Sequence, residues 1–137
     1  MNPPAEGAGH VILVADDDPG IRRFVTGCLK GRGFVVREVQ DGIAACESAE
    51  ANPPSLVLLD LVLPKRDGYA VLLHLRSREA TRSVPVVLMS GEAEGEHTEV
   101  SRTLGAQAFI SKPFTLAHLV STLEAALKVK VGPPGSP

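Results

Sequence analysis

Four places in the sequence put polar side chains at the end of, or inside, a short apolar run. The acidic stretch Asp16–Asp18 follows the first such run, and Asp60 lies inside the apolar stretch Leu56–Leu63. Ser90 and Lys112 follow two later runs. An acid among apolar residues carries a desolvation cost unless a partner compensates its charge. These residue types therefore suggest one site at which carboxylates, a hydroxyl and an amine act together.

The chemistry that suits this combination is phosphoryl transfer to a carboxylate. Carboxylates about 4 Å apart repel by roughly 4 kcal/mol at an effective dielectric of 20, so raised pKa values, Lys112 or a bound cation must offset the repulsion. Oxygen ligands favour Mg²⁺, and carboxylates can accept phosphoryl groups. Asp60 as acceptor, with Mg²⁺ and Lys112 neutralising phosphoryl oxygens and Ser90 donating a hydrogen bond, explains all the groups. Two simpler interpretations stay open: a solvated turn at Asp16–Asp18 that caps a helix, and a structural Lys112–Asp60 ion pair.

Five short apolar runs are the expected strands that would position these groups. Most are apolar at nearly every residue, which is typical of a parallel sheet covered on both faces. The gaps of about 16–26 residues between them are long enough for a crossover helix and too long for a hairpin. The expected strands are Val11–Ala15, Phe34–Val39, Leu56–Leu59, Val86–Met89 and Ala108–Ile110.

The gaps carry helical patterns. Pro19 suits the first turn of the first helix, and Asp41, Asp67 and Thr115 are candidate caps of later helices. The fourth gap, with few apolar anchors, has the weakest pattern. Apolar residues recur at helical spacing in two gaps, at Ile21, Phe24, Val25, Cys28 and Leu29 and again at Leu116, Leu119, Val120, Leu123 and Leu127.

Strand and helix thus alternate five times, which predicts an α/β protein with a doubly wound parallel sheet and helices on both faces. In such a sheet the ligand site lies beyond the carboxyl ends of the strands, where the strand order reverses. The acids, the serine and the lysine all follow strands, so the same edge should bring them together.

The sequence resembles the receiver domain of two-component response regulators, of the chemotaxis-receiver type, over about residues 10–130. The resemblance rests on four motifs in order: Val14–Pro19, Leu59–Gly68, Met89–Gly91 and Ser111–Phe114. It implies a flavodoxin-like three-layer (βα)5 sandwich with a five-stranded parallel sheet in the order 2-1-3-4-5.

The resemblance also implies roles for the acidic and basic residues. Asp60 looks like the phosphorylated aspartate, and Lys112 looks like the family's lysine. Asp17 looks like a direct ligand of Mg²⁺ (or Mn²⁺), together with Asp60 and the main-chain carbonyl of Val62. Asp16 would act on the metal indirectly, through water or a hydrogen bond.

Four further residues match positions of the family. Ser90 resembles the hydroxyl of the switch, and Phe109 resembles the aromatic that turns inward on activation. Pro113 resembles a proline that family members hold in cis. Val62 and Glu92 match the positions that tune the lifetime of the phosphate, and they predict opposite effects on that lifetime. Glu92 could hydrogen-bond an attacking water, whereas Val62 could not.

The expected function is that of a phospho-accepting signalling module, which is not an enzyme except for its own phosphorylation and dephosphorylation. A sensor histidine kinase or a phosphotransfer protein would donate the group to Asp60, and the surface of the fourth helix, fifth strand and fifth helix would switch. The alternative is a phosphohydrolase or phosphotransferase of the haloacid-dehalogenase type, but such enzymes usually carry a second Asp where this sequence has Val62.

Composition excludes several other classes. With 14 Lys and Arg against 16 Asp and Glu, and only 4% aromatic residues, broad electrostatic or stacking contact with nucleic acid is not expected. The apolar stretches are far shorter than a membrane span needs, and two cysteines make no disulfide framework.

The expected organisation is a disordered tail at residues 1–9, one receiver domain at 10–130, and a disordered tail or linker stub at 131–137. The start of the chain lacks the features of a signal peptide, so a cytoplasmic location is expected. Further expected partners are an output domain or a downstream protein, and a second copy of the chain in a weak dimer on phosphorylation.

Overall fold

The computed structural model describes residues 9–91 and 94–131, and the side chains of 92–98 and 128–131 are outside that description. The predicted disorder of the two tails therefore falls almost wholly on residues that are not described, and so does Glu92. Within the described part, no helix combines the length and the apolar character that crossing a membrane requires.

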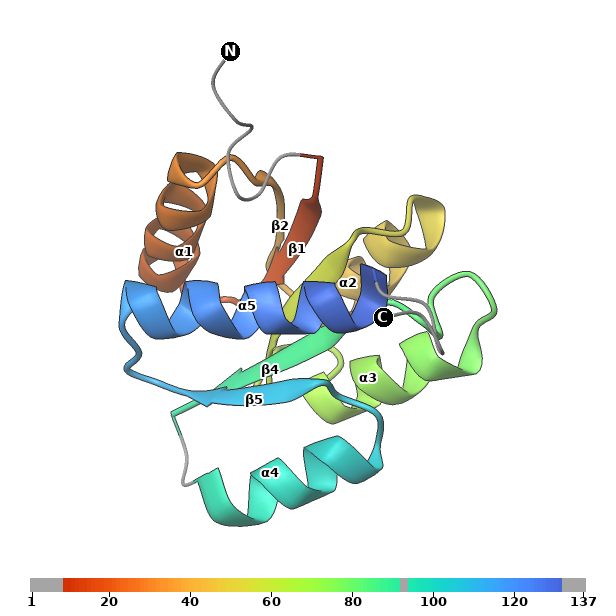
Figure 1. Cartoon of the computed structure of the whole chain (residues 1–137). Helices are drawn as coiled ribbons and strands as arrows, with labels where there is room; N and C mark the ends of the chain where they lie inside the picture. Colours follow the sequence, from red (N-terminus) through yellow and green to blue (C-terminus); the bar gives the residue numbers. More distant parts are fainter. Residues whose placement is uncertain (1–8, 92–93, 132–137) are drawn as a thin grey trace.

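Five parallel strands form one sheet in the order β2-β1-β3-β4-β5, which confirms the predicted strand order (Figure 1). Each strand lies within one or two residues of its predicted position, because runs of apolar residues leave few alternatives in a sheet that is buried on both faces. The strands are β1 (Val11–Ala15), β2 (Val35–Val39), β3 (Leu56–Asp60), β4 (Val86–Ser90) and β5 (Ala108–Ser111).

A helix follows every strand, as the sequence predicts. Asp18 caps α1 with a side-chain oxygen that accepts from the N–H of Gly20, and Asp41, Asp67 and Thr115 cap α2, α3 and α5 in the same way. The helices are α1 (Pro19–Gly31), α2 (Gly42–Ala51), α3 (Gly68–Ser77), α4 (Glu94–Thr103) and α5 (Leu116–Val131).

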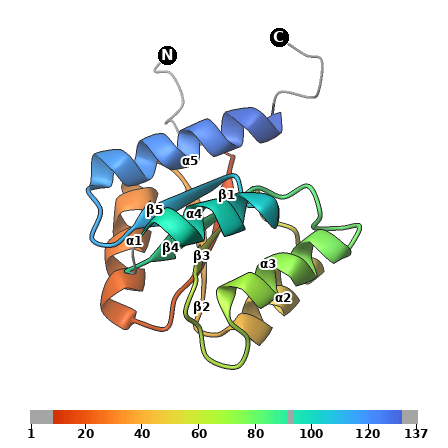
Figure 2. The same ribbon diagram turned by 90° about the horizontal axis from the view of Figure 1, so that it is seen from below.

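The helices cover the sheet in two layers, and the strands alternate their side chains between two cores (Figure 2). Leu13 and Leu59 point into the core beneath α2 and α3, whereas Val14 and Leu58 point into the core beneath α1 and α5. All four side chains are fully buried. The polar residues at the strand ends therefore stand on a rigid double-sided support.

Two apolar residues that the helical patterns predict to be buried lie at the surface instead. Phe24 of α1 is 49% exposed and Leu116 of α5 is 38% exposed. The buried face of α1 is centred on Val25 and Leu29, so Phe24 stands at the border of that face. The apolar spacing therefore predicts the two helices correctly but includes too many residues in the buried face of each helix.

Candidate functional site

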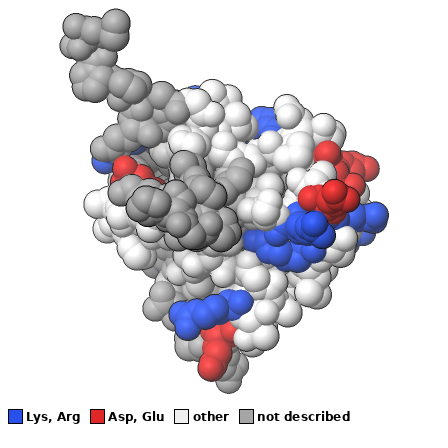
Figure 3. Space-filling model, turned by 45° about the vertical axis from the view of Figure 1, so that its right-hand side comes forward, with Lys and Arg blue, Asp and Glu red and all other residues white. Residues whose placement is uncertain are grey.

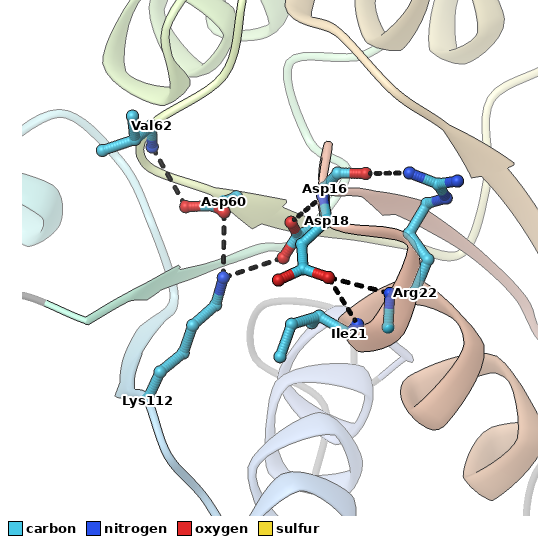
Figure 4. A network of polar contacts seen from close by, with 8 residues as sticks. Asp16, Asp18, Ile21, Arg22, Asp60, Val62 and Lys112 are labelled. Atoms are coloured by element: carbon cyan, nitrogen blue, oxygen red, sulfur yellow. Dashed lines mark hydrogen bonds and ion pairs between the residues drawn. The ribbon is translucent and has the colours of Figure 1, made fainter.

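The site lies at the carboxyl edge of the sheet, as the strand pattern predicts (Figure 4). Asp60 and Ser90 are the last residues of β3 and β4, and Asp16 and Lys112 directly follow β1 and β5. Main-chain hydrogen bonds continue beyond the strand ends: the N–H of Lys112 donates to the carbonyl of Ser90 at 2.7 Å, and that of Leu61 donates to Met89 at 2.8 Å. The backbone that carries these groups is therefore held in register.

Lys112 connects two of the acids. Its Nζ donates to Asp16 Oδ2 at 2.8 Å and to Asp60 Oδ2 at 2.9 Å. Burial opposes the charge of Lys112, but the hydrogen bonds to both carboxylates outweigh it and raise the pKa of the amine. A structural ion pair between Lys112 and Asp60 thus exists, as one of the simpler interpretations supposed, but the ammonium is shared with a second acid.

Asp60 is buried, with 7% of its surface exposed. Its Oδ1 accepts from the N–H of Val62 at 3.0 Å, so each carboxylate oxygen has one donor. Burial raises the pKa of Asp60 above its ordinary value of 3.8, while Lys112 and Val62 act in the opposite direction. The site thus holds a carboxylate whose charge is only partly compensated.

The three consecutive aspartates have three different environments. Asp18 caps α1, whereas Asp17 is exposed. Asp16 is fully buried, and its Oδ1 accepts from the N–H of Asp18 at 2.9 Å while Oδ2 accepts from Lys112. The interpretation as a solvated capping turn therefore holds for Asp18 alone.

Asp16, Asp17 and Asp60 form an acidic cluster. Each can offer a carboxylate oxygen, and these oxygens lie within 4.8 Å of one another. In the part of the chain that the structure describes, the ammonium of Lys112 is the cation that pairs with these carboxylates. Clustered oxygen donors with excess negative charge fit a hard divalent cation such as Mg²⁺, which commonly uses one or two carboxylates and keeps part of its water shell.

The remaining predicted residues lie around this cluster. Ser90 is buried at the end of β4, and the Lys112–Pro113 peptide bond is cis. Phe109 is partly buried against the core beneath α2 and α3, and lines a cavity of about 40 Å³ with Ser101 and Arg102 of α4. Val62 is 61% exposed beside Asp60, whereas Glu92 lies outside the described residues.

Arg22 of α1 is a further residue at the site, and it lies outside the four motifs. The side chain is only 14% exposed. Its Nη1 donates to the carbonyl of Asp16 at 2.8 Å, and its Nε lies 3.3 Å from Glu38 Oε1 of β2. Arg22 shares the helical spacing of the buried residues Val25, Thr26 and Leu29. Only the fold shows that its side chain reaches back to the end of β1.

Gly68 is a second residue whose contact with the site the structure makes clear. A methyl group added there would lie 2.6 Å from the carbonyl oxygen of Asp60, and the N–H of Gly68 donates to Leu61 at 2.8 Å. The start of α3 therefore packs directly on the backbone of the phospho-acceptor candidate. The sequence signal for it was the Asp67–Gly68 pair that opens the helix.

The surface does not show one dominant charge on the face drawn in Figure 3. Basic and acidic side chains lie next to one another there, with wide neutral areas between them. This agrees with the balanced composition of 14 basic and 16 acidic residues. Charge is mixed on the face drawn in Figure 3, whereas the acidic cluster places three carboxylates beside the Lys112 ammonium.

Comparison with known proteins agrees with this geometry. The family model of the response regulator receiver domain matches residues 12–124. The transcriptional regulator RpaA of Synechocystis sp. is 33% identical over 117 residues, 85% of this chain and 48% of that protein. PhoB of Escherichia coli, a phosphate regulon transcriptional regulatory protein, is also 33% identical over 117 residues, 85% of this chain and 51% of its own length.

The chain thus spans about half the length of these curated relatives. Since they are named as transcriptional regulators, and RpaA as DNA-binding, the expectation of no direct contact with nucleic acid is not confirmed for a protein of this kind. The comparisons give no support to the alternative of a haloacid-dehalogenase-type enzyme.

Among solved structures, the receiver domain of the sensor histidine kinase PA1611 from Pseudomonas aeruginosa has a TM-score of 0.81 and 31% identity. The match covers 88% of this chain and 99% of that one, and the structure holds a magnesium ion in its active-site cleft. Family model, relatives and fold agree along nearly the whole described chain. The chain belongs to the response regulator receiver domain family of two-component signalling systems.

Proposed function

We propose that this receiver domain accepts a phosphoryl group on Asp60. The observation that carries the proposal is the environment of that side chain: a buried carboxylate at the end of β3, held by Lys112 and the Val62 N–H, beside the carboxylates of Asp16 and Asp17. A carboxylate can act as a nucleophile toward phosphorus. An acid placed only for stability would gain little from having further acids next to it.

The donor set fits a divalent cation, Mg²⁺ or Mn²⁺. Asp17 and Asp60 would hold it directly, with the main-chain carbonyl of Val62. Asp16 would act indirectly, through water or a hydrogen bond, as the family resemblance implies. When bound, the cation neutralises negative charge on the carboxylates and on the incoming phosphoryl oxygens.

The transfer itself needs positioning and charge neutralisation more than covalent help from other residues. An oxygen of Asp60 attacks phosphorus, forming an O–P bond, while the N–P bond of a phosphohistidine breaks and its electron pair stays on the imidazole. Lys112 already donates to Asp60 and is placed to neutralise a phosphoryl oxygen as well. A sensor histidine kinase, a phosphotransfer protein or a small acyl phosphate supplies the group.

The phosphorylated state would be read through Ser90 and Phe109. A phosphoryl group adds charge and acceptor oxygens, toward which the Ser90 hydroxyl can donate. Movement of Ser90 would free space for Phe109 and repack the surface formed by α4, β5 and α5. Phe109 has no hydroxyl, so its inward position would depend on packing alone. Val62 and Glu92 would tune the lifetime of the phosphate.

The proposal is tested by incubating the protein with labelled acetyl phosphate and Mg²⁺. The wild-type chain and Asp18→Asn should both incorporate label, because Asp18 caps α1 and Asn caps a helix equally well. Asp60→Ala should incorporate none. Labelling retained by Asp60→Ala, at the wild-type level, would contradict the assignment.

A further inference from the structure

We propose that the first turn of α2, and Gly42 in particular, positions the loop that carries Val62 and thereby sets the affinity of the site for Mg²⁺. The inference rests on the proposed function of the acidic cluster. Gly42 is a positioning residue, because it does not touch the reacting atoms but contacts the middle of the segment between β3 and α3, residues 61–67.

The loop has a conformation that its own sequence does not favour. Lys65 has a φ of +68°, the left-handed region, which is costly for a residue with a side chain. Such a conformation persists only where surrounding structure imposes it. One end of the loop is covalently fixed to Asp60 and the other packs through Gly68, so contacts from outside must hold its middle.

The middle of the loop is held by α2. The N–H of Gly42 donates to the carbonyl of Pro64 at 3.1 Å, and that carbonyl also accepts from the N–H of Arg66 at 2.7 Å. The Asp41 carboxylate, which caps α2, lies 3.6 Å from Lys65 Nζ. Gly42 and the capping residue Asp41 therefore contact three consecutive residues of the loop.

Only glycine fits at position 42. A methyl group there would lie 1.9 Å from the carbonyl oxygen of Arg66 and 2.6 Å from its carbonyl carbon. These are backbone atoms, so a side chain could be accommodated only by moving the loop. A displaced loop moves Val62, whose N–H holds Asp60 and whose carbonyl is the proposed main-chain ligand.

The side chain of Arg66 adds a second connection between the loop and the helices. Its Nη1 lies 3.4 Å from Cys46 Sγ of α2 and 3.3 Å from His74 Nδ1 of α3. The loop is therefore attached to both neighbouring helices, and α2 supplies the contact closest to the strained residue.

Gly42→Ala tests the inference, with Gly27→Ala of α1 as the matched control, since a methyl group at Gly27 meets nothing within 4 Å. The readout is the dissociation constant of Mg²⁺ alone, from amide shifts of Val62 and Asp17 in a magnetic resonance titration. Gly42→Ala should raise that constant about tenfold, as loss of an outer contact to a metal site commonly does, and Gly27→Ala should leave it unchanged. An unchanged constant in folded Gly42→Ala overturns the inference.

A measurement on the wild-type chain keeps the inference testable if Gly42→Ala does not fold. Coupling is reciprocal, so a contact that favours Mg²⁺ binding must itself be strengthened by Mg²⁺. Hydrogen exchange of the Gly42 amide should slow on saturation with Mg²⁺, while that of the Gly27 amide stays constant. Unchanged exchange at Gly42 would overturn the inference.

Labelling with acetyl phosphate separates this inference from the proposed function. If wild-type protein binds Mg²⁺ but takes up no label, the proposed function fails while the role of Gly42 in metal affinity can still hold. If the wild-type chain is labelled and Gly42→Ala keeps the wild-type Mg²⁺ constant, the role of Gly42 fails alone. Saturating Mg²⁺ should restore most of the labelling rate of Gly42→Ala.

Discussion

Two partly buried cations, at opposite ends of the sheet, show how differently the fold uses positive charge. Lys112 lies at the carboxyl edge and donates to the carboxylates of Asp16 and Asp60. Arg76 of α3 lies near the amino ends of β4 and β5, where it donates to neutral oxygens. These are the carbonyls of Thr81, Val84 and Gly105 and the side-chain amide of Gln107.

The pKa shifts of the two groups follow their partners. Burial lowers the pKa of Arg76, whereas the acidic partners raise that of Lys112 in spite of its burial. Among the residues that the structure describes, the hydrogen-bond partners of Arg76 are neutral, and they connect α3, the start of β4 and the turn before β5. The role of Arg76 is therefore structural. Lys112 compensates part of the negative charge of Asp16 and Asp60. A bound cation would compensate more of that charge and a phosphoryl group would add to it, so the role of Lys112 is functional.

The largest effect should come from Lys112→Met, which removes the charge that would face the phosphoryl oxygens. The rate of labelling by acetyl phosphate should fall at least about 100-fold, the usual cost of removing one preorganised donor. The variant should remain folded, since carboxylates that lose their cation can take up protons. Circular dichroism checks folding. If folded Lys112→Met were labelled at the wild-type rate, Lys112 would have no functional role that distinguishes it from Arg76.

Arg76→Met should have the opposite pattern. Several carbonyl groups lose a charged donor, so the free energy of unfolding should fall by about 3 kcal/mol, while the folded protein keeps its labelling rate. Urea unfolding measures the change. Arg82→Met is the control, because Arg82 is exposed and lies in the segment between α3 and β4. It should leave the free energy of unfolding almost unchanged. An equally stable Arg76→Met protein would show that this network is not structural.

Asp60→Asn should make the protein more stable, because the site holds a carboxylate that burial disfavours. The pKa of Asp60 is raised above 3.8, so the folded state binds its proton more readily than the unfolded state does. Stability of the wild-type chain due to this group is then lost as pH rises through the raised pKa. Asp60→Asn should therefore be more stable than the wild-type chain at pH 7, where the wild-type carboxyl group is charged in both states.

The same gain should shrink as the pH falls toward 3.8, the ordinary value for an aspartate. Urea unfolding of both proteins at several pH values gives the difference directly. If the stability gain of Asp60→Asn stays constant across this pH range, the charge of Asp60 is fully compensated in the folded protein. The contrast between the sites of Lys112 and Arg76 would then be smaller than we infer.

The smallest effect should come from a third cation, Lys65, which is exposed and pairs with Asp41. Lys65→Gly relieves the left-handed φ but loses the ion pair and adds freedom to the unfolded chain, leaving a net gain of about 0.5 kcal/mol. Lys65→Ala keeps the strained φ and should be less stable than the wild-type chain. Thermal unfolding compares the stabilities of Lys65→Gly and Lys65→Ala. If Lys65→Ala were the more stable variant, the left-handed φ of Lys65 would not be strained.

Much of the fold could be predicted from the sequence, because parallel strands buried on both faces leave continuous apolar runs. The four motifs placed Asp60, Ser90 and Lys112 at strand ends, and the topology then brought them to one edge. Caps were also readable, since Asp41 and Asp67 stand directly before the helices they cap.

The parts that could not be predicted depend on contacts between elements that are distant in sequence. Arg22 shares the helical spacing of the buried residues Val25 and Leu29, but only the fold places its side chain on the carbonyl of Asp16. Arg76 likewise reaches Gly105, a turn that follows α4. Gly42 opens a helix, but its close approach to Arg66 exists only once α2 and the loop pack together.

The central claim, that Asp60 receives the phosphoryl group, is tested most directly by locating the modified residue. Acetyl phosphate and Mg²⁺ would be added to the wild-type chain, followed by borohydride, which reduces an aspartyl phosphate to homoserine. Peptide mass spectrometry should then find homoserine at position 60 alone. Homoserine at position 16 or 17, or unmodified aspartate at position 60 in a chain that has taken up label, would contradict the claim.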